Sequence, residues 1–357
     1  MMKELIKGNE ALAESAIIAG CRHYFGYPIT PQNEITAYMA KRMPEVGGVF
    51  VQAESEVAAI NMVFGAAAAG VRVITTTSSP GFSLMQEGVS YIAAAHLPCV
   101  LANVMRGGPG LGNIAGSQGD YFQAVKGGGH GDYRLIVLMP AYVQEMIDFT
   151  ILAFDLADKY LIPVLILTDG IVGQMVEPAE FPKDYKPNFY DKSWALTGAK
   201  GRPRNIVRTL WLDDYGVENN NIKLQQKYAR IKAEVVMYDE FMTEDAEVIF
   251  VAYGTPARIC KSITKKLRDQ GYKVGTFRLQ SAFPFPEYRL MELALEKHVK
   301  GFLVVEMSAG QMVEDVRLSV KDYKPVNFYG RMGGVLPEEN KIIEYALDML
   351  KGGVEIH

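Results

Sequence analysis

Cysteine is scarce in this sequence of 357 residues, and the three that occur, Cys21, Cys99 and Cys260, lie far apart. Their odd number and wide spacing fit neither a disulfide framework nor a Cys-x-x-Cys metal or iron–sulfur site. The sequence also lacks a cluster of histidine, cysteine and aspartate at the spacing of metal ligands. We therefore predict no metal site in this chain and expect any redox metal on another chain.

Excess charge and long apolar runs are missing as well. The net charge is −4 without long runs of either sign, and no basic stripe with interleaved aromatic residues is present, which argues against nucleic-acid binding. No stretch reaches the length of about 18 apolar residues that a membrane span needs. The first residues, Met-Met-Lys-Glu-Leu-Ile-Lys, lack the apolar segment of a signal peptide. We expect a cytoplasmic protein without a membrane or nucleic-acid partner.

Short apolar runs, by contrast, are frequent and alternate with helical patterns. The runs predict buried parallel strands at residues 23–27, 49–53, 71–76, 98–105, 134–139 and 163–168. A second, smaller βα series begins near residue 247, after a proline-containing stretch with one helix around 223–235. We therefore predict an α/β protein with an open parallel sheet in residues 1–180, a connecting segment at 181–243 and a smaller α/β domain at 244–357.

Three polar groups follow predicted strands, where α/β proteins bind ligands. They are the hydroxyl of Thr30 within Tyr-Pro-Ile-Thr-Pro (27–31), the carboxyl of Glu56 and the guanidinium of Arg106. Each also has a structural interpretation. Glu56 could be a first-turn helix acid beside an N-cap at Ser55, Thr30 could belong to a simple turn, and Arg106 could form a structural ion pair.

Neighbouring motifs are less specific. The glycine-rich segment 107–119 matches no phosphate-loop or dinucleotide fingerprint and is predicted to be a mobile active-site loop. The hydroxyl-rich segment 75–79 could bind an anion at a helix N-terminus, although helix capping is the favoured interpretation. His130 and Asp132 could be an acid–base pair, but a hydrogen bond that fixes a loop is the more common role for such a pair.

Taken in order, these motifs resemble the alpha subunit of 2-oxoacid:ferredoxin oxidoreductases. The resemblance rests on Tyr-Pro-Ile-Thr-Pro, Glu-Ser-Glu-Val-Ala-Ala from Glu54, Thr-Thr-Thr-Ser-Ser-Pro-Gly from Thr75, Arg106 and Gly-His-Gly-Asp. It covers most of the chain, because Ala-Tyr-Gly-Thr from Ala252 opens what looks like the family's transketolase-C-terminal-like domain. It implies that residues 1–180 form a pyrimidine-binding domain for thiamine diphosphate.

The resemblance also implies roles for single residues. Glu56 would hydrogen-bond the pyrimidine ring of the cofactor, and Thr30 and Arg106 would contact the substrate near its carbonyl and carboxylate groups. Pro28 and Ser78 would join Glu56 and Thr30 in binding the cofactor. The reaction implied is oxidative decarboxylation of a 2-oxoacid to acyl-coenzyme A and CO2, with electrons passing to ferredoxin.

A further absence bears on partners. The family's Gly-Asp-Gly…Asn motif for diphosphate and magnesium is not present, since Thr168-Asp169-Gly170 lacks the first glycine and the matching asparagine. The resemblance therefore implies half a cofactor site. A beta subunit would bring the diphosphate half and magnesium, and gamma or ferredoxin-like delta subunits would bring iron–sulfur clusters.

The substrate is the least determined feature. A branched 2-oxoacid, 3-methyl-2-oxobutanoate, is favoured by the overall likeness, followed by 2-oxoglutarate and then pyruvate, because an apolar pocket discriminates weakly between side chains. Two other classes remain open: a self-sufficient enzyme with a nucleotide site, disfavoured because no dinucleotide fingerprint follows a strand, and a non-catalytic scaffold subunit.

Overall fold

The larger part of the molecule is built on a seven-stranded sheet. The computed structural model describes residues 3–188 and 190–352. The strand order is β12-β6-β7-β5-β4-β2-β3, and neighbours from β6 to β3 are parallel. The strands are β2 (His23–Gly26), β3 (Val49–Gln52), β4 (Val73–Thr77), β5 (Cys99–Met105), β6 (Ile136–Leu138), β7 (Pro163–Asp169) and β12 (Ser281–Phe283). The central strands β4, β5 and β7 are buried along their whole length, as expected for a parallel sheet covered on both faces.

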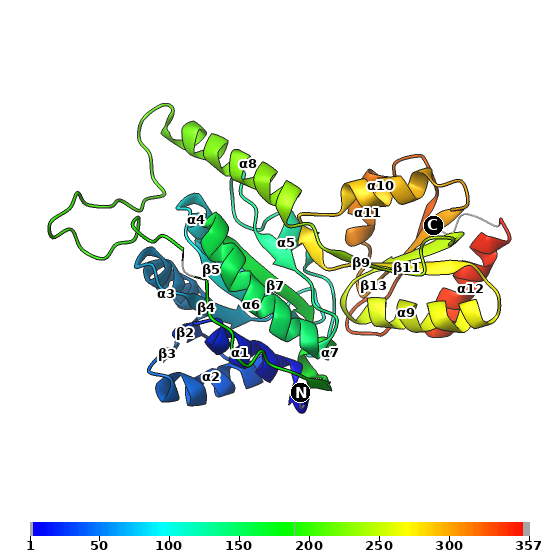
Figure 1. Ribbon diagram of the computed structural model, residues 1–357, viewed down its shortest axis with the longest axis horizontal. Helices are drawn as coiled ribbons and strands as arrows, with labels where there is room; N and C mark the ends of the chain where they lie inside the picture. The colour runs from blue at the N-terminus through cyan, green and yellow to red at the C-terminus, as the bar shows by residue number, and fades with distance from the viewer. Residues whose placement is uncertain (1–2, 189, 353–357) are drawn as a thin grey trace.

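Helices cover this sheet in two groups (Figure 1). Helix α1 packs against α2 and α6, whereas α3 packs against α4. Small residues on α1 and α3 allow close packing, and most residues of α1 are buried. The helices are α1 (Gly8–Ile18), α2 (Asn33–Glu45), α3 (Glu56–Ala68), α4 (Ser79–Ala94), α5 (Tyr121–Val125), α6 (Val143–Tyr160) and α7 (Gly170–Gln174). The predicted βα alternation is therefore present.

A second sheet of five strands lies beside the first, in the order β14-β13-β10-β11-β9. Its strands are β9 (Tyr238–Phe241), β10 (Val248–Ala252), β11 (Val274–Leu279), β13 (Gly301–Glu306) and β14 (Val326–Gly330). It is covered by α9 (Gly254–Asp269), α10 (Glu287–Leu295), α11 (Met312–Val320) and α12 (Glu339–Leu350). No helix of the described residues is long and apolar enough to cross a membrane.

The predicted parallel sheet of residues 1–180 is confirmed, and one further strand from outside that range joins its edge. β12 follows the second-sheet strand β11 in the chain, yet it pairs antiparallel with β6 of the first sheet. β9 departs from prediction, because it lies in the predicted connecting segment and pairs antiparallel with β11. Short edge strands of this kind leave no long apolar run in the sequence. A two-stranded pair of β1 (Glu4–Lys7) and β8 (Val176–Ala179) was likewise not predicted.

Helix α8 (Gly216–Glu234) begins earlier than predicted. The sequence Glu218-Asn219-Asn220-Asn221 predicts a turn but is helical here. Asn220 explains the difference, because its amide donates to the Ala94 carbonyl at 3.0 Å and its oxygen meets the His96 ring at 3.0 Å. Tertiary hydrogen bonds therefore outweigh the weak helix propensity of asparagine.

Buried polar contacts join the two sheets. Asp169 at the end of β7 accepts hydrogen bonds from the Thr255 backbone (2.9 Å) and hydroxyl (2.7 Å) at the start of α9. The Gln118 amide donates to the Tyr253 carbonyl at 3.0 Å, and its oxygen accepts from the Met307 backbone at 3.0 Å. These bonds fix the second sheet next to the carboxyl edge of the first.

Candidate functional site

The predicted site residues gather at the carboxyl edge of the first sheet. β5, β4, β2 and β3 are consecutive neighbours in that sheet, and each is followed by one of the predicted segments. Residues 27–31 follow β2, Glu56 opens the helix after β3, Ser78 follows β4 and Arg106 follows β5. Parallel strands bring these carboxyl ends to the same edge of the sheet, where ligands bind in such folds.

Glu56 is a buried carboxylate, with 5% of its surface exposed. The predicted N-cap is correct, since the Ser55 hydroxyl accepts from the Ala58 backbone at 3.2 Å. The Glu56 side chain is not only a first-turn acid of α3, because its carboxylate lies next to Gly81 of α4. A Cβ atom at Gly81 would lie 2.3 Å from Glu56 Oε1 and 2.1 Å from Thr77 Oγ1. Among the described residues no donor bonds to the Glu56 carboxylate, which leaves its oxygens available for a ligand.

Hydroxyl groups beside Glu56 are also unpartnered. Thr75, Thr77 and Ser78 are buried, and their side-chain oxygens have no hydrogen-bond partner among the described residues. Ser78 stands at the N-cap position of α4, but its hydroxyl makes no capping bond. The capping interpretation is therefore wrong for Ser78. A buried hydroxyl without a partner costs free energy of about 1–3 kcal/mol. Thr75 lies in the middle of β4, whereas Thr77 and Ser78 lie at its carboxyl end, so these two indicate a place where a polar ligand fits.

Arg106 is a buried cation without a carboxylate. Its side chain donates to the Thr30 carbonyl at 2.9 Å and to the Leu111 carbonyl at 3.0 Å, and 7% of the residue is exposed. No Asp or Glu among residues 3–188 and 190–352 forms an ion pair with it, so the structural ion pair considered from the sequence is wrong. Its buried Nε has no partner. A buried guanidinium in this state suits an anionic ligand, with a carboxylate as the natural match.

Thr30 lies within contact of Arg106 through its backbone. Its peptide bond to Pro31 is cis, a feature that the sequence did not reveal. Thr30 is half-buried, and its hydroxyl accepts from the Asn33 side chain at 3.1 Å. Pro28 is half-buried in the same turn. The structure therefore brings Thr30, Pro31 and Arg106 together.

Amide side chains that the sequence analysis missed hold this turn in place. Asn9 of α1 and Gln174 of α7 both donate to the Pro31 carbonyl, at 2.8 and 2.7 Å. Buried Gln32 accepts from the Thr76 hydroxyl at 2.7 Å and donates to the Tyr27 carbonyl at 3.2 Å. No motif marks these residues, because they come from distant parts of the chain and act on backbone carbonyls.

A second missed group lies behind Arg106. The Ser79 hydroxyl accepts from the Arg106 backbone N–H at 3.0 Å and donates to Asp120 at 2.6 Å. Asn103 donates to the same Asp120 oxygen at 2.9 Å. Burial raises the pKa of Asp120, and the Ser79 and Asn103 hydrogen bonds oppose that rise. Asp120 thereby fixes the backbone position from which the Arg106 side chain extends.

A cavity of about 530 Å³ opens beside this group. It lies between the start of α4, the glycine-rich loop and the segment after β13. Asp120 is the only charged residue among those described that line it; the others include Ser79, Pro80, Pro109, Phe122, Met307, Ala309 and Met332. The cavity is also lined by Ser83, Ser117, Gln123, Ser308 and Gln311, so its wall is of mixed polarity with one acidic group.

The glycine-rich segment 107–119 folds around Arg106. The Gly107 N–H donates to the Ala115 carbonyl at 2.9 Å, and the Asn113 amide donates to the Gly333 carbonyl at 2.6 Å. Leu111 and Ile114 of this loop are 80% and 67% exposed. The loop thus joins the Arg106 site to the second sheet, and its mobility stays a prediction.

His130 and Asp132 do not form the predicted pair. Both are exposed, and no hydrogen bond joins their side chains. His130 lies edge-on to Tyr91 with ring centroids 6.4 Å apart, and the Asp132 carbonyl accepts from Gln225 at 2.9 Å. Neither the acid–base role nor the loop-fixing bond between them is present.

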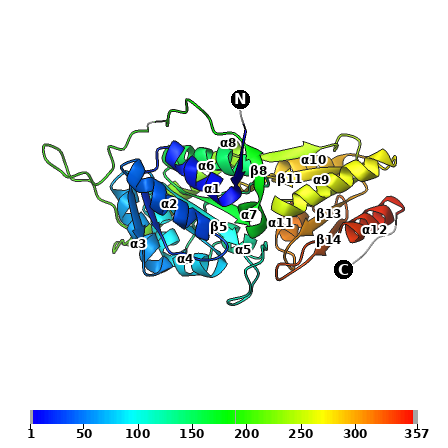
Figure 2. The same cartoon turned by 90° about the horizontal axis from the view of Figure 1, so that it is seen from below.

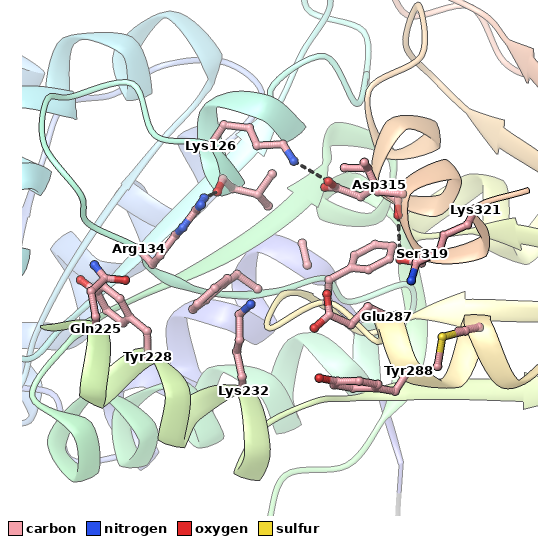
Figure 3. A pocket seen from close by; sticks show the side chains of 16 residues that line it. Lys126, Arg134, Gln225, Tyr228, Lys232, Glu287, Tyr288, Asp315, Ser319 and Lys321 are labelled. Carbon is pink, nitrogen blue, oxygen red and sulfur yellow. Dashed lines mark hydrogen bonds and ion pairs between the residues drawn. The ribbon is translucent and has the colours of Figure 1, made fainter.

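A second cavity, of about 500 Å³, lies between α8, α10 and α11 (Figure 3). Lys126 and Asp315 form an ion pair across it, while Lys232 reaches in from α8. Glu56, Thr30 and Arg106 line neither this cavity nor the 530 Å³ cavity, but the latter is lined by Ser79 and Asp120, which hold the Arg106 backbone. We therefore place the candidate site at the carboxyl edge of the first sheet.

The residues at this edge fit one half of a thiamine diphosphate site. A buried carboxylate without a donor can receive a hydrogen bond from a ring nitrogen, and the absence of a side chain at Gly81 leaves it room. The part of the chain that the structure describes offers no Asp169 carboxylate for a diphosphate-bound metal. Asp169, the acid of the predicted partial motif, instead accepts from the Ile171 and Val172 backbones and from Thr255.

Two segments match families of known proteins. Residues 14–240 match “Pyruvate flavodoxin/ferredoxin oxidoreductase, thiamine diP-bdg”, and residues 246–342 match “Pyruvate:ferredoxin oxidoreductase core domain II”.

Several known proteins are similar over almost the whole chain. The ketoisovalerate oxidoreductase subunit VorB of Methanothermobacter thermautotrophicus is 50% identical over 96% of this chain and 97% of its own. The 2-oxoglutarate synthase subunit KorA of Methanocaldococcus jannaschii is 39% identical over 95% of this chain and 98% of its own.

Solved structures share the fold. The 2-oxoglutarate:ferredoxin oxidoreductase from Magnetococcus marinus, with 2-oxoglutarate, coenzyme A and succinyl-CoA bound, has a TM-score of 0.87 at 26% identity. The match covers 98% of this chain and 65% of that one. A split-gene transketolase has a TM-score of 0.57 at 14% identity, a likeness of fold alone.

Proposed function

Because this chain belongs to the 2-oxoacid:ferredoxin oxidoreductase family as an alpha-type subunit, we propose that it holds the pyrimidine half of a shared thiamine diphosphate site. The reaction proposed is oxidative decarboxylation of a branched 2-oxoacid, 3-methyl-2-oxobutanoate. The products are the acyl-coenzyme A and CO2, and the electrons leave to ferredoxin. The observation that carries the proposal is the donor-free, buried carboxylate of Glu56 beside Gly81.

Glu56, Thr30, Pro28 and Ser78 are the proposed cofactor contacts. When bound, thiamine diphosphate supplies the nucleophilic carbon and the electron sink for decarboxylation. Glu56 would hold a proton against a ring nitrogen of the pyrimidine, and its burial keeps water from competing for that hydrogen bond. The unpartnered Ser78 hydroxyl would gain a partner in the same site.

Arg106 and Thr30 are the proposed substrate contacts. The Arg106 guanidinium would pair with the 2-oxoacid carboxylate, and its bonds to the carbonyls of Thr30 and Leu111 limit its rotation. Asp120 and Ser79 support this geometry through the Arg106 backbone. Because the guanidinium is already oriented, the arginine side chain loses less conformational entropy when the substrate binds.

The branched substrate is supported by similarity and by the charge of the cavity that Ser79 and Asp120 line, although the Arg106 side chain does not itself line that cavity. The relative with 50% identity is named for ketoisovalerate, whereas those named for 2-oxoglutarate are at or below 40%. The described lining of the 530 Å³ cavity includes no lysine or arginine and has one acid, Asp120. A second carboxylate, as in 2-oxoglutarate, would meet repulsion there. 2-Oxoglutarate remains the alternative substrate because of the KorA relatives.

The proposed complex is cytoplasmic and heteromeric. A beta subunit would supply the diphosphate half of the site with magnesium, and gamma or delta subunits would supply iron–sulfur clusters. Coenzyme A would enter as co-substrate. The lack of a diphosphate motif in this chain supports the division of the site between subunits.

The test is 2-oxoacid-dependent viologen reduction by this chain co-purified with its partner subunits. Thiamine diphosphate, magnesium and coenzyme A are supplied, and 3-methyl-2-oxobutanoate, 2-oxoglutarate and pyruvate are compared. We expect the highest kcat/KM with 3-methyl-2-oxobutanoate. A preference for 2-oxoglutarate would contradict the substrate assignment. No activity from a complex with bound cofactor and intact clusters would favour the scaffold interpretation.

A further inference from the structure

The segment of residues 196–215, here called the arm, stands away from the rest of the molecule. It precedes α8 and contains no helix or strand. Two perpendicular views show this part of the chain extending beyond the helices that cover the first sheet (Figure 1, Figure 2). Within the arm, the partly buried Val207 packs against the core of its own chain, whereas most of the other arm residues are exposed.

The residues before the arm are firmly attached. Arg72, just before β4, donates to Asp155 at 2.7 Å, to Asp158 at 2.8 Å and to the Asn188 carbonyl at 3.1 Å. Lys192 pairs with the same Asp158 at 2.8 Å. The base of the arm is thus held at the amino edge of the first sheet, opposite the edge that carries Glu56 and Arg106.

Ala195 ends this attached base. It is 1% exposed and lies against Gly70, where a Cβ atom would come within 2.7 Å of the Ala195 methyl. The Leu196 backbone then donates to the Ala68 carbonyl at 2.8 Å. The chain leaves the surface directly after a rigid contact, so the direction in which the arm starts is fixed.

Apolar side chains on the arm lie in solvent. Ile206, Leu210 and Tyr215 are 65%, 67% and 67% exposed, and Leu212 is 91% exposed. Their density within ten residues distinguishes them from scattered surface leucines, which need no explanation. A segment without a core of its own gains stability when such side chains are buried against another surface.

The arm is also cationic. The arm contains four cations, Lys200, Arg202, Arg204 and Arg208, and two acids, Asp213 and Asp214, both next to its junction with α8. None of these four forms an ion pair within the described part of the chain; Arg202 donates to carbonyls of its own loop, and Arg208 lies over the Trp211 ring at 5.4 Å. The charge is thus available to a partner.

From these observations we propose that the arm is a docking element for an acidic surface on a partner subunit of the oxidoreductase complex. The surface would present carboxylates to the four cations and apolar sockets to Ile206, Leu210 and Leu212. The most exposed apolar side chain, Leu212, is aliphatic, and the Trp211 ring is already covered by Arg208. A protein surface is therefore favoured over nucleic acid, whose bases are held by stacking on aromatic rings. The identification of the partner as a subunit of this complex rests on the proposed function.

The position of the arm makes this contact separate from the one that completes the cofactor site. The diphosphate half must approach the carboxyl edge, where Glu56 lies, whereas the arm leaves from the amino edge. The complex would therefore be held at two distant places. Loss of the arm should weaken assembly while leaving the geometry of the Glu56 site unchanged.

The first experiment identifies what the arm touches. Leu212 is replaced by a photoreactive phenylalanine analogue in the co-expressed complex, and the adducts formed on irradiation are analysed by mass spectrometry. Leu318 of α11, 70% exposed, is the matched control position. We expect an adduct from position 212 with one partner subunit, on peptides rich in Asp and Glu. An adduct only with a second copy of this chain, an adduct with nucleic acid, or no adduct would overturn the proposal.

The second experiment measures the contribution of the arm to assembly. Arg204→Glu with Arg208→Glu reverses two charges, and Leu210→Ser with Leu212→Ser removes two apolar contacts. Each double variant should weaken subunit association at least about tenfold, the effect of losing interface contacts of ordinary strength. The charge variant should also dissociate at lower salt. Lys321→Glu serves as the charge control, because Lys321 follows α11 beside the second sheet, is exposed and forms no ion pair with any described residue.

Assembly is measured by native mass spectrometry and sedimentation, independently of activity. The arm lies outside the core, so circular dichroism of the variants should match that of the parent chain. Unchanged association in both double variants would overturn the proposal. If the 2-oxoacid activity itself were absent, these assembly measurements would still report on the arm, and the two failures can be told apart.

Discussion

At the scale of single residues, the site depends on groups that remain buried and unsatisfied. The hydroxyls of Thr77 and Ser78 and the Nε of Arg106 lack the partner that burial normally requires, and no donor among the described residues bonds to the carboxylate of Glu56, a residue 5% exposed. Such groups reduce the stability of the isolated chain. Their concentration at one sheet edge is understandable if a cofactor and a substrate complete their hydrogen bonds.

Gly81 gives a residue-scale prediction. In Gly81→Ala the new methyl would lie 2.3 Å from Glu56 Oε1 and 2.1 Å from Thr77 Oγ1, so the carboxylate must move. We expect most of the decarboxylation activity to be lost, with a stability cost of about 1–3 kcal/mol from overpacking. Gly65→Ala is the control, because nothing lies within 4 Å of a Cβ there. It should keep full activity and gain about 0.5–1 kcal/mol. Equal activity in the two variants would contradict the position assigned to Glu56.

Arg106 gives a second prediction at this scale. In Arg106→Lys the charge remains, but one ammonium cannot replace the fork that bonds to the Thr30 and Leu111 carbonyls and still bind a carboxylate. Loss of a charge-assisted hydrogen bond worth about 1.5–3 kcal/mol raises the KM for the 2-oxoacid about 10- to 100-fold. The KM for coenzyme A should stay constant in the same complex. Steady-state kinetics with each substrate varied in turn would show whether only the 2-oxoacid is affected.

At the scale of elements, helix α8 is attached by an unusual pair. Lys227 of α8 donates to the Leu161 carbonyl at 2.6 Å and to His96 Nδ1 at 2.8 Å. Burial lowers the pKa of Lys227 to about 7. Burial, and then the charges of Lys227 and Lys223, lower the pKa of His96. Both groups are therefore favoured in their neutral forms when the helix is docked.

The pH dependence of stability follows from this. The unfolded chain binds a proton on Lys227 up to the ordinary pKa of 10.5, whereas the folded chain releases it above about 7. The unfolded state thus binds more protons between these values, so this contribution to the free energy of unfolding rises with pH across that window. The unfolded chain also binds a proton on His96 more readily than the folded chain does, because the folded pKa lies below the ordinary value of 6.5. The free energy of unfolding therefore falls further as the pH drops below 6.5.

Lys227→Met tests this account of α8. Relative to the variant, the parent chain should gain stability as the pH rises from 7 to 9. Lys223 occupies an exposed position of the same helix. The difference in free energy of unfolding between the parent chain and Lys223→Met should therefore stay constant over this pH range. Urea unfolding at several pH values provides the free energies. Parallel pH profiles for the parent chain and Lys227→Met would show that the low pKa is not present.

The elements also show what the sequence could predict. Long apolar runs such as those of β5 and β7 specify central strands, because both faces are buried. Short edge strands such as β12 carry no such run, and their pairing depends on tertiary contacts. Similarly, Ser55 has the expected capping bond, whereas Ser78, at the same kind of position, does not. Local sequence alone cannot distinguish a capping serine from one left free for a ligand.

At the scale of the whole molecule, the two sheets are joined by a buried ion pair. Arg278 of β11 makes two parallel bonds to Glu145 of α6, at 2.8 and 2.7 Å. Their side chains are 6% and 15% exposed. This pair fixes the second sheet relative to the first, and with it the loops that line the cavity beside Arg106.

Arg278→Leu would leave the Glu145 carboxylate buried with only weaker partners. We expect a loss of about 3–5 kcal/mol in the free energy of unfolding, as for other broken buried pairs. Arg289→Leu removes a more exposed pair with Glu240 and should cost less than about 1 kcal/mol. Chemical denaturation of both variants gives the comparison. Similar losses in the two variants would contradict the claim that the buried Arg278–Glu145 pair stabilises the protein more than the exposed Arg289–Glu240 pair.

The candidate site could be predicted in part because its strand-end positions converge in any parallel sheet. Glu56, Thr30 and Arg106 were identified in this way, and the resemblance to a family supplied their roles. Asn9, Gln174 and Asp120 were missed, because they act through backbone carbonyls or through Ser79, and only the folded chain brings them there. Residues that partner subunits would contribute to the site cannot be predicted from the sequence of this chain alone.

The central claim, that Glu56 acts on the pyrimidine half of a shared cofactor, is tested most directly by Glu56→Gln in the co-purified complex. We expect intact assembly, bound cofactor and near-total loss of 2-oxoacid-dependent viologen reduction, because an amide cannot exchange a proton with the ring nitrogen as a carboxylate can. Subunit composition by native mass spectrometry is measured on the same samples. An unchanged rate in a fully assembled complex would contradict the role assigned to Glu56 and, with it, the placement of the site.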